Sequence, residues 1–267
     1  MASRLFLTNM RLVANLPKRD TLAIAASLAG ISILAWGYLV MMARDMSSPH
    51  ALCMAAMQIH RWSAGYFWMM FWMWAVMMVG MMVPSAAPMI LIYAAVARKA
   101  EKQGTPIAST GAFTLGYVFM WTVFSFLVTL AQWQLDKAAL LSSIMMANSP
   151  LLGAGLMIAA GLYQWLPIKN SCLKHCRSPF HFISTHWRSG NAGAFMMGIS
   201  HGAFCIGCCW VLMLLLFVGG VMNLLWIALI SVFVLLEKVL PLGDHGGKWA
   251  GVLMVVIGLM IMNGEIM

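Results

Sequence analysis

Four potential metal ligands recur at helical spacing inside one long apolar run of the chain. They are His201, Cys205, Cys208 and Cys209. Positions i, i+4, i+7 and i+8 share one face of a helix, and Met213 would extend that face. Thiolate and thioether ligands favour Cu(I), thiolate also suits zinc, and imidazole accepts either metal. The run therefore predicts a soft-metal site, with copper as the first candidate and zinc as the second.

A packing role would explain the same run equally well. Free Cys is among the most buried residue types and packs as a small hydrophobe. Gly198 and Gly202 form a small-xxx-small pair, which lets a neighbouring helix approach closely. The residues by themselves leave metal chemistry and helix packing both open.

A second thiol pair lies in the basic segment that follows the fourth apolar run. Cys172 and Cys176 are four residues apart, and in a reducing cytoplasm they should be thiols rather than a disulfide. The pair resembles half of a zinc site, although a second pair at the usual spacing is missing. It predicts metal or redox chemistry at the cytoplasmic face, and the alternative is a basic juxtamembrane loop with incidental thiols.

A third group of soft ligands precedes the second apolar run. If this segment is helical, His50, Cys53 and Met57 share a face, and together they would make an external landing site for Cu(I). The alternative is an interfacial helix whose apolar face uses Met.

Methionine is unusually frequent, with 27 residues in the chain, and it is concentrated in the run at 65–97. A methionine ladder could pass Cu(I) along a helix, or the side chains could be flexible fillers against the aromatic rings. Pro84 is expected to kink this helix and to free a backbone carbonyl, which in a membrane needs a partner such as Ser85 or water.

The composition defines the fold class. Hydrophobic residues make up 63% of the chain and charged residues 9%, which predicts an all-α, polytopic bundle of transmembrane helices. Residues 1–20 form a basic cytoplasmic arm, and residues 21–267 form a single integral membrane domain. About seven spans are expected, at 21–42, 65–97, 111–131, 151–166, 192–220, 222–240 and 249–262. The runs at 65–97 and 192–222 exceed a simple crossing and could tilt, break or re-enter.

Charge predicts the orientation of the spans. All but three of the 16 basic residues fall on one predicted side, the exceptions being Arg44, Arg61 and Lys137. The positive-inside rule then makes the N-terminus cytoplasmic and the C-terminus external. The net charge of +9 is explained by this asymmetry, so anionic lipid is the expected partner and nucleic acid is not. An acid within a span, Glu237, is expected to pair with a lysine.

Several segments resemble a bacterial family of predicted metal-binding integral membrane proteins, defined by a domain of unknown function. The segments are Gly198-xxx-Gly202-xx-Cys205-x-Gly207-Cys208-Cys209-Trp210-xx-Met213, Tyr163-Gln164-xx-Pro167-x-Lys169-xx-Cys172-Leu173-xx-Cys176-Arg177-x-Pro179, Met222-Asn223-Leu224, Glu237-Lys238-xx-Pro241-x-Gly243 and Met81-Met82-x-Pro84-Ser85-xx-Pro88-Met89. The likeness covers roughly residues 65–262, and His201 is not part of the family pattern. It implies metal binding in a bacterial inner membrane.

The leading hypothesis is a membrane protein that moves Cu(I) across the inner membrane or delivers it to a membrane metalloenzyme or metallochaperone. Cys205, Cys208 and Cys209 would hold the ion, and Met213 or His201 would complete its shell. The alternatives are a non-catalytic accessory subunit of a membrane complex and a thiol-redox protein. An enzyme is not favoured, because the sequence has no P-loop and no recognisable nucleophile with its base.

Overall fold

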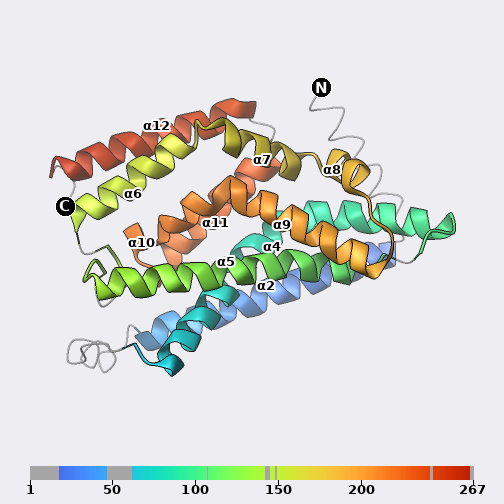
Figure 1. The fold of residues 1–267 in the computed structure, drawn as a ribbon, viewed down its shortest axis with the longest axis horizontal. Coiled ribbons are helices and arrows are strands. Elements are labelled where there is room, and N and C mark those ends of the chain that lie inside the picture. The colour runs from blue at the N-terminus through green and yellow to red at the C-terminus, as the bar shows by residue number, and fades with distance from the viewer. Residues whose placement is uncertain are drawn as a thin grey trace.

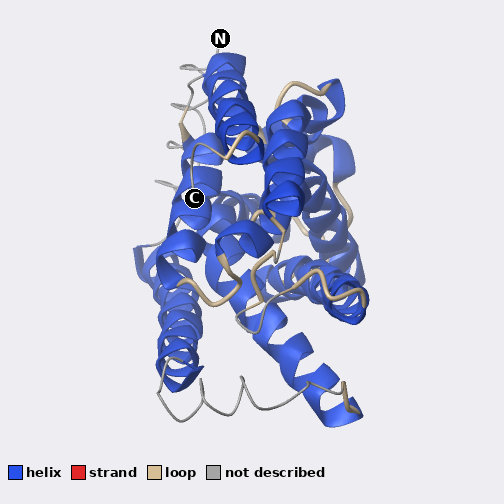
Figure 2. Cartoon of the chain, turned by 90° about the vertical axis from the view of Figure 1, so that its left-hand side faces the viewer, coloured by secondary structure: helices blue, strands red, loops and turns tan. Residues whose placement is uncertain are grey.

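The computed structural model describes residues 18–46, 62–106, 108–141, 145–147, 149–240 and 243–264. These residues are mainly helical (Figures 1 and 2). The helices are α2 (Lys18–Met46), α4 (Ala64–Lys102), α5 (Thr110–Lys137), α6 (Pro150–Tyr163), α7 (Pro167–Arg177), α8 (Pro179–His186), α9 (Gly190–Leu214), α10 (Leu216–Gly219), α11 (Leu224–Val239) and α12 (Gly243–Met262). The all-α prediction is confirmed. The predicted arm lies outside the described residues except for 18–20, which begin α2.

The expected seven spans are too many. Within the described residues, four segments are long and apolar enough to cross a membrane: α2, α4, α5, and α9 together with α10. A fifth is counted only if α6 and α7, which are bent by 65° at their junction, form one broken span. α11 has 16 residues and the apolar part of α12 is Gly246–Met262, both short of the roughly 20 residues that a crossing needs. These apolar runs were predicted as spans from hydropathy, which does not show where each helix ends.

The core of the bundle is one buried cluster to which α4, α5 and α9 all contribute. Six methionines of α4 are at most 1% exposed and belong to this cluster together with Trp74 and Trp121. The six are Met70, Met73, Met77, Met78, Met81 and Met82. Trp74 Nε1 donates a hydrogen bond of 2.6 Å to Gln132 Oε1 on α5, which joins the two helices through a satisfied polar pair. Most of the methionines of α4 therefore fill the core.

Helix α4 continues as one helix of 39 residues through Pro84 and Pro88. Pro84 has no N–H, so the carbonyl of Gly80 loses its helical donor. Trp36 Nε1 of α2 donates to that carbonyl at 3.2 Å. Ser85, the partner expected from the sequence, instead donates to the carbonyl of Met82 at 2.8 Å. A side chain from a distant helix therefore satisfies the group that the proline leaves free.

Helices α9 and α5 pack with their backbones in close approach (Figure 1). A Cβ added at Gly198 would overlap the carbonyl oxygen of Phe113, and one at Gly116 would overlap the carbonyl oxygen of Phe195. A Cβ added at Gly202 would lie 2.7 Å from Cβ of Met120. The packing interpretation of Gly198 and Gly202 is thus confirmed, and this contact fixes the position of α9 beside α5.

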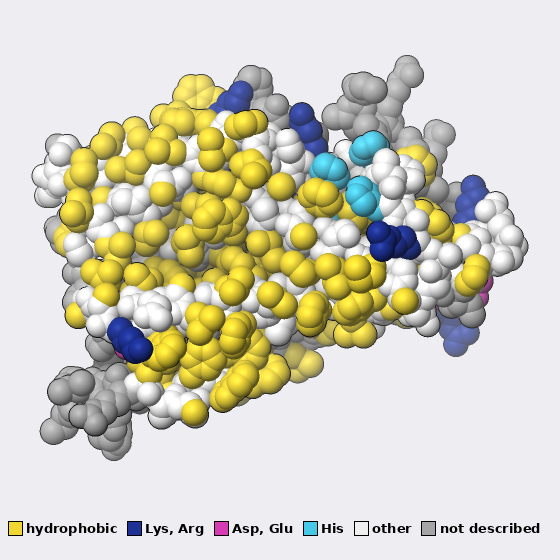
Figure 3. Space-filling view, viewed as in Figure 1, with side chains coloured by type: hydrophobic (Ala, Val, Ile, Leu, Met, Phe, Trp, Pro, Cys, Tyr) yellow, Lys and Arg dark blue, Asp and Glu magenta, His cyan; other side chains and the backbone are white. Residues whose placement is uncertain are grey.

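Helix α7 packs against α9. Leu166 is the residue before Pro167, and α7 starts at that proline, where a missing N–H is tolerated. The bend between α6 and α7 turns α7 toward α9 and α11 instead of continuing outward (Figure 1). The face of the molecule shown in Figure 3 is largely hydrophobic, which suits a lipid environment.

Candidate metal centre

The predicted ligands on α9 are buried inside the bundle. Cys205 and Cys209 are 0% exposed, and Cys208 is 1% exposed. The thiols of Cys208 and Cys209 both donate to the carbonyl of Cys205, at 3.0 and 2.9 Å. Helical spacing therefore puts the three cysteines on one buried face of α9, as the sequence predicted, and all five described cysteines are free thiols.

A fourth thiol joins these three from α7. The Cys176 thiol lies close enough to interact with Cys205 and with Cys208, and Cys209 likewise interacts with both. We call Cys176, Cys205, Cys208 and Cys209 the thiol cluster. The sequence had suggested a separate cytoplasmic role for Cys176, whereas the fold brings it to the cysteines of α9.

A buried lysine lies against the thiol cluster. Lys238 Nζ of α11 is 2.9 Å from Cys205 Sγ and 2.9 Å from Ser85 Oγ of α4, and it donates to both. The residue is 9% exposed. A buried ammonium needs a counter-charge, and the Glu237 carboxylate is already paired with Lys169. The two side-chain groups that this ammonium contacts are Cys205 Sγ and Ser85 Oγ.

The hydroxyl of Tyr117 reaches the same sulfur from α5. It lies 3.2 Å from Cys205 Sγ, and it donates to the carbonyl of Met82 at 3.2 Å. Tyr117 is 0% exposed. Four helices thus converge on Cys205, with α4, α5 and α11 contributing polar groups and α7 contributing a thiol.

An ion pair holds α7 against α11. Lys169 Nζ lies 2.6 Å from Glu237 Oε1, and their side chains are 1% and 5% exposed. Lys169 also donates to Gln164 Oε1, and Arg177 Nε donates to the backbone carbonyl of Glu237 at 2.8 Å. The expected pairing of Glu237 with a lysine is confirmed. These bonds fix α7 at both ends and so hold Cys176 beside α9.

His201 and Met213 are buried on α9 but differ in their surroundings. The His201 ring stacks on Tyr117, with centroids 5.6 Å apart, and its Nδ1 is buried with no hydrogen-bond partner. Met213 is 0% exposed, one helical turn after Cys209.

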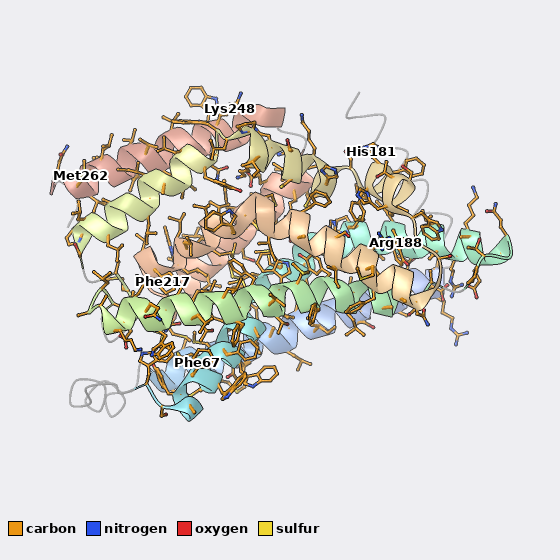
Figure 4. The ribbon with its side chains drawn as sticks, in the orientation of Figure 1. Phe67, His181, Arg188, Phe217, Lys248 and Met262 are labelled. Carbon is orange, nitrogen blue, oxygen red and sulfur yellow. The ribbon has the colours of Figure 1, made fainter. Side chains whose placement is uncertain are left out.

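Figure 4 shows His181 of α8 and Arg188 toward the end of the molecule opposite Met262. His175 and His186 pack on Phe204 and Phe182, and a group of histidines lies over α7 and α8 in Figure 3.

Cys172 of α7 is a fifth thiol that lies near Cys208 of the thiol cluster. Cys172 is half-buried on α7, and its sulfur faces Gly207 of α9, where an added Cβ would lie 2.7 Å from it. His50, Cys53 and Met57 fall outside the described residues. The predicted external landing site therefore stays a prediction.

The donor set of the thiol cluster suits a soft ion better than a hard one, because its ligands are sulfur. Among the described residues, no group of three or more His, Cys, Asp or Glu side chains is arranged to hold a metal. A sulfur donor set without a preformed metal site is explained by the side-chain conformations. Cys208 and Cys209 turn their thiols toward a backbone carbonyl and not toward a common centre. Rotation of these side chains about χ1 would be needed to present their sulfurs together.

Sequence reasoning missed Lys238 and Tyr117 as members of this site. Neither residue was among the candidate ligands that the sequence indicated. The available signal was the motif pattern, since Ser85 and Lys238 stand in the segments quoted for the family resemblance. Only the contact between α4 and α11 brings these two segments together.

Comparison with known families supports a role in copper handling. The family described as "PpoB2: Copper chaperone" matches residues 71–261, which is most of the chain and includes the whole thiol cluster. No curated protein and no solved structure matches the chain. The chain belongs to the PpoB2 copper chaperone family, and its spans make it a membrane copper-handling protein. The predicted copper function is thereby confirmed, and such a family is typically non-catalytic.

Proposed function

We propose that the thiol cluster is the Cu(I) site of this chaperone. Cys205 and Cys208 hold the ion, with Cys176 and Cys209 within reach of it. The observation that carries the proposal is the burial of these thiols against one another and against Lys238, deep in the bundle. Thiolates select Cu(I), and a buried site protects the bound ion from water and oxidants.

The remaining predicted ligands take secondary roles in this proposal. Met213 and His201 lie on the same helix and can complete the copper shell during transfer. Cys172 sits beside Gly207 at the edge of the site. His50, Cys53 and Met57 serve as an external exchange point for a partner that gives or receives copper, which would be a membrane metalloenzyme or a metallochaperone.

The protein acts in the bacterial inner membrane in this proposal, with its N-terminus in the cytoplasm. The positive-inside asymmetry supports this orientation, and the expected external C-terminus remains part of the proposal. Basic side chains end α4, at Lys99 and Lys102, and Arg177 ends α7. The thiol cluster is then accessible from the cytoplasmic half of the bundle.

The test is a metal measurement on matched variants. Wild type, Cys205→Ser/Cys208→Ser and Cys172→Ser are purified in mild detergent with protected thiols after copper-replete growth. Mass spectrometry then gives the copper-to-protein ratio. We expect near-stoichiometric copper in wild type and in Cys172→Ser, and loss of at least nine-tenths of it in the double variant.

Folding is checked by circular dichroism and size-exclusion chromatography, so that copper loss through unfolding is recognised. Stoichiometric copper in a well-folded double variant would remove Cys205 and Cys208 from the site. Zinc in place of copper in wild type would contradict the copper assignment and indicate a structural or regulatory metal. A wild type that binds no metal would favour the accessory-subunit alternative.

A further inference from the structure

A cavity of about 450 Å³ lies beside the thiol cluster, between α4, α7, α9 and α11. Most of its wall is apolar and comes from the stretch of α4 between Pro84 and Ile92. Its other lining residues are Cys176, Arg177, Pro179, His201, Lys238 and Val239. Two cations, one thiol, the Ser85 hydroxyl and the His201 imidazole therefore face a mainly apolar space.

Cys176 is the thiol that connects this cavity with the cluster. It lines the cavity wall, and its side chain also contacts Cys205 and Cys208. Those two cysteines and Cys209 are not part of the cavity wall. An ion that enters the cavity thus meets Cys176 first, and the cysteines of α9 lie behind it.

The charges in the cavity discriminate between forms of copper. Arg177 and Lys238 are positive, so a bare Cu⁺ ion is repelled from the space they line. Two thiolates on one Cu(I) leave a net negative charge, and the same cations attract such a complex. The cavity is also too small for a folded carrier protein, but it is within the usual size range of small-molecule pockets.

His201 adds an independent sign that the cavity takes a polar ligand. Its side chain lines the wall, is 3% exposed, and has a buried Nδ1 with no hydrogen-bond partner. Buried polar atoms are nearly always satisfied, so an orphaned one in a cavity wall calls for a partner. A carboxylate-bearing or amide-bearing thiol can supply that partner.

We propose that this cavity is the copper portal, which receives Cu(I) as a complex with a small anionic thiol and passes the ion to Cys176. The proposal rests on the thiol cluster being the copper site. The Cu–S bond to Cys176 forms as one of the two Cu–S bonds to the carrier thiolates breaks, and the proton of the Cys176 thiol goes to the departing thiolate. In the second exchange, Cu–S bonds to Cys205 and Cys208 form as the bonds to Cys176 and to the remaining carrier thiolate break. The protons of Cys205 and Cys208 go to Cys176 and to that second carrier, and copper stays Cu(I) throughout.

The portal is tested by filling the cavity and timing copper uptake. Ala87 of α4 lines the cavity and is half-buried, whereas Ala95 is also half-buried on the same helix but does not line the cavity. Copper-free wild type, Ala87→Phe and Ala95→Phe in detergent are mixed with Cu(I)–glutathione. Rapid desalting and mass spectrometry follow the bound copper with time.

We expect Ala87→Phe to load at least tenfold more slowly than wild type and to reach the same final copper content. Ala95→Phe should load at the wild-type rate. Equal rates in wild type and a well-folded Ala87→Phe would overturn the portal. The final copper content of wild type tests the copper site, whereas the difference in loading rate between the variants tests the portal. The two proposals can therefore fail independently.

Carrier charge gives a second measurement that needs no cavity-filling variant. Copper is offered to wild type as its complex with mercaptoethanesulfonate, which is anionic, or with cysteamine, which is cationic. At low salt, uptake from the anionic carrier should be at least fivefold faster. Arg177→Gln should reduce the preference and Arg177→Lys should keep it. Uptake that ignores carrier charge, as expected if a lipid chain fills the cavity, would refute the proposal.

Discussion

Replacing Glu237 with Gln should destabilise the protein strongly. Glu237 Oε1 and Lys169 Nζ are 2.6 Å apart, and the two side chains are 5% and 1% exposed. Gln is close to Glu in shape, so the substitution removes the charge and leaves the buried ammonium of Lys169 without a counter-ion. Leaving one partner of a buried pair uncompensated costs about 3–5 kcal/mol.

This free energy corresponds to a large shift in melting temperature. At about 2–4 °C per kcal/mol for chains of roughly this size, Tm should fall by about 6–20 °C. The assay is thermal unfolding in detergent, followed by circular dichroism. Arg98→Gln serves as the control, because Arg98 pairs with Asp20 at the surface and its side chain is 49% exposed. That exposed pair should contribute less than about 1 kcal/mol.

A double variant separates the buried charge from the loss of packing. Lys169→Met/Glu237→Met removes both charges and keeps side-chain volume, and such replacements are often neutral or stabilising. It should recover most of the Tm that Glu237→Gln loses. A fall of less than about 2 °C in Glu237→Gln, or a double variant that unfolds no later than the single one, would refute the reasoning.

Two further predictions concern the packing and the polar contacts around Cys205. Gly198→Ala should cost about 1–3 kcal/mol in denaturant unfolding, because its Cβ would overlap the carbonyl oxygen of Phe113. Gly155→Ala is the control and should not destabilise the protein, because its Cβ would have nothing within 4 Å. Equal stabilities of the two variants would contradict the close packing of α5 and α9. Tyr117→Phe should lose about 0.5–1.5 kcal/mol and keep full copper content, because its hydroxyl supports Cys205 and Met82 without adding a metal ligand. Loss of copper in a folded Tyr117→Phe would instead show that this hydroxyl belongs to the binding site.

The sequence alone determined the helical membrane class, the soft-metal chemistry and the shared face of the α9 cysteines. These features do not depend on tertiary contacts. An apolar composition indicates a lipid environment, and the helical period of about 3.6 residues decides which side chains share a face. Cys205, Cys208 and Cys209 come together for that reason. The close approach of α9 to a neighbouring helix at Gly198 and Gly202 was also predictable, because small residues four apart allow two helix backbones to pack closely.

Tertiary structure decided which distant residues complete the site. Cys176 reaches the cysteines of α9 because α6 and α7 are bent by 65°, and Lys238 reaches Cys205 because α11 packs on α4. The number of spans and the partner of the Gly80 carbonyl were likewise set by where helices end and which neighbours they meet. No local pattern encodes such contacts. They follow from the requirement that buried charges and backbone groups find partners anywhere in the fold.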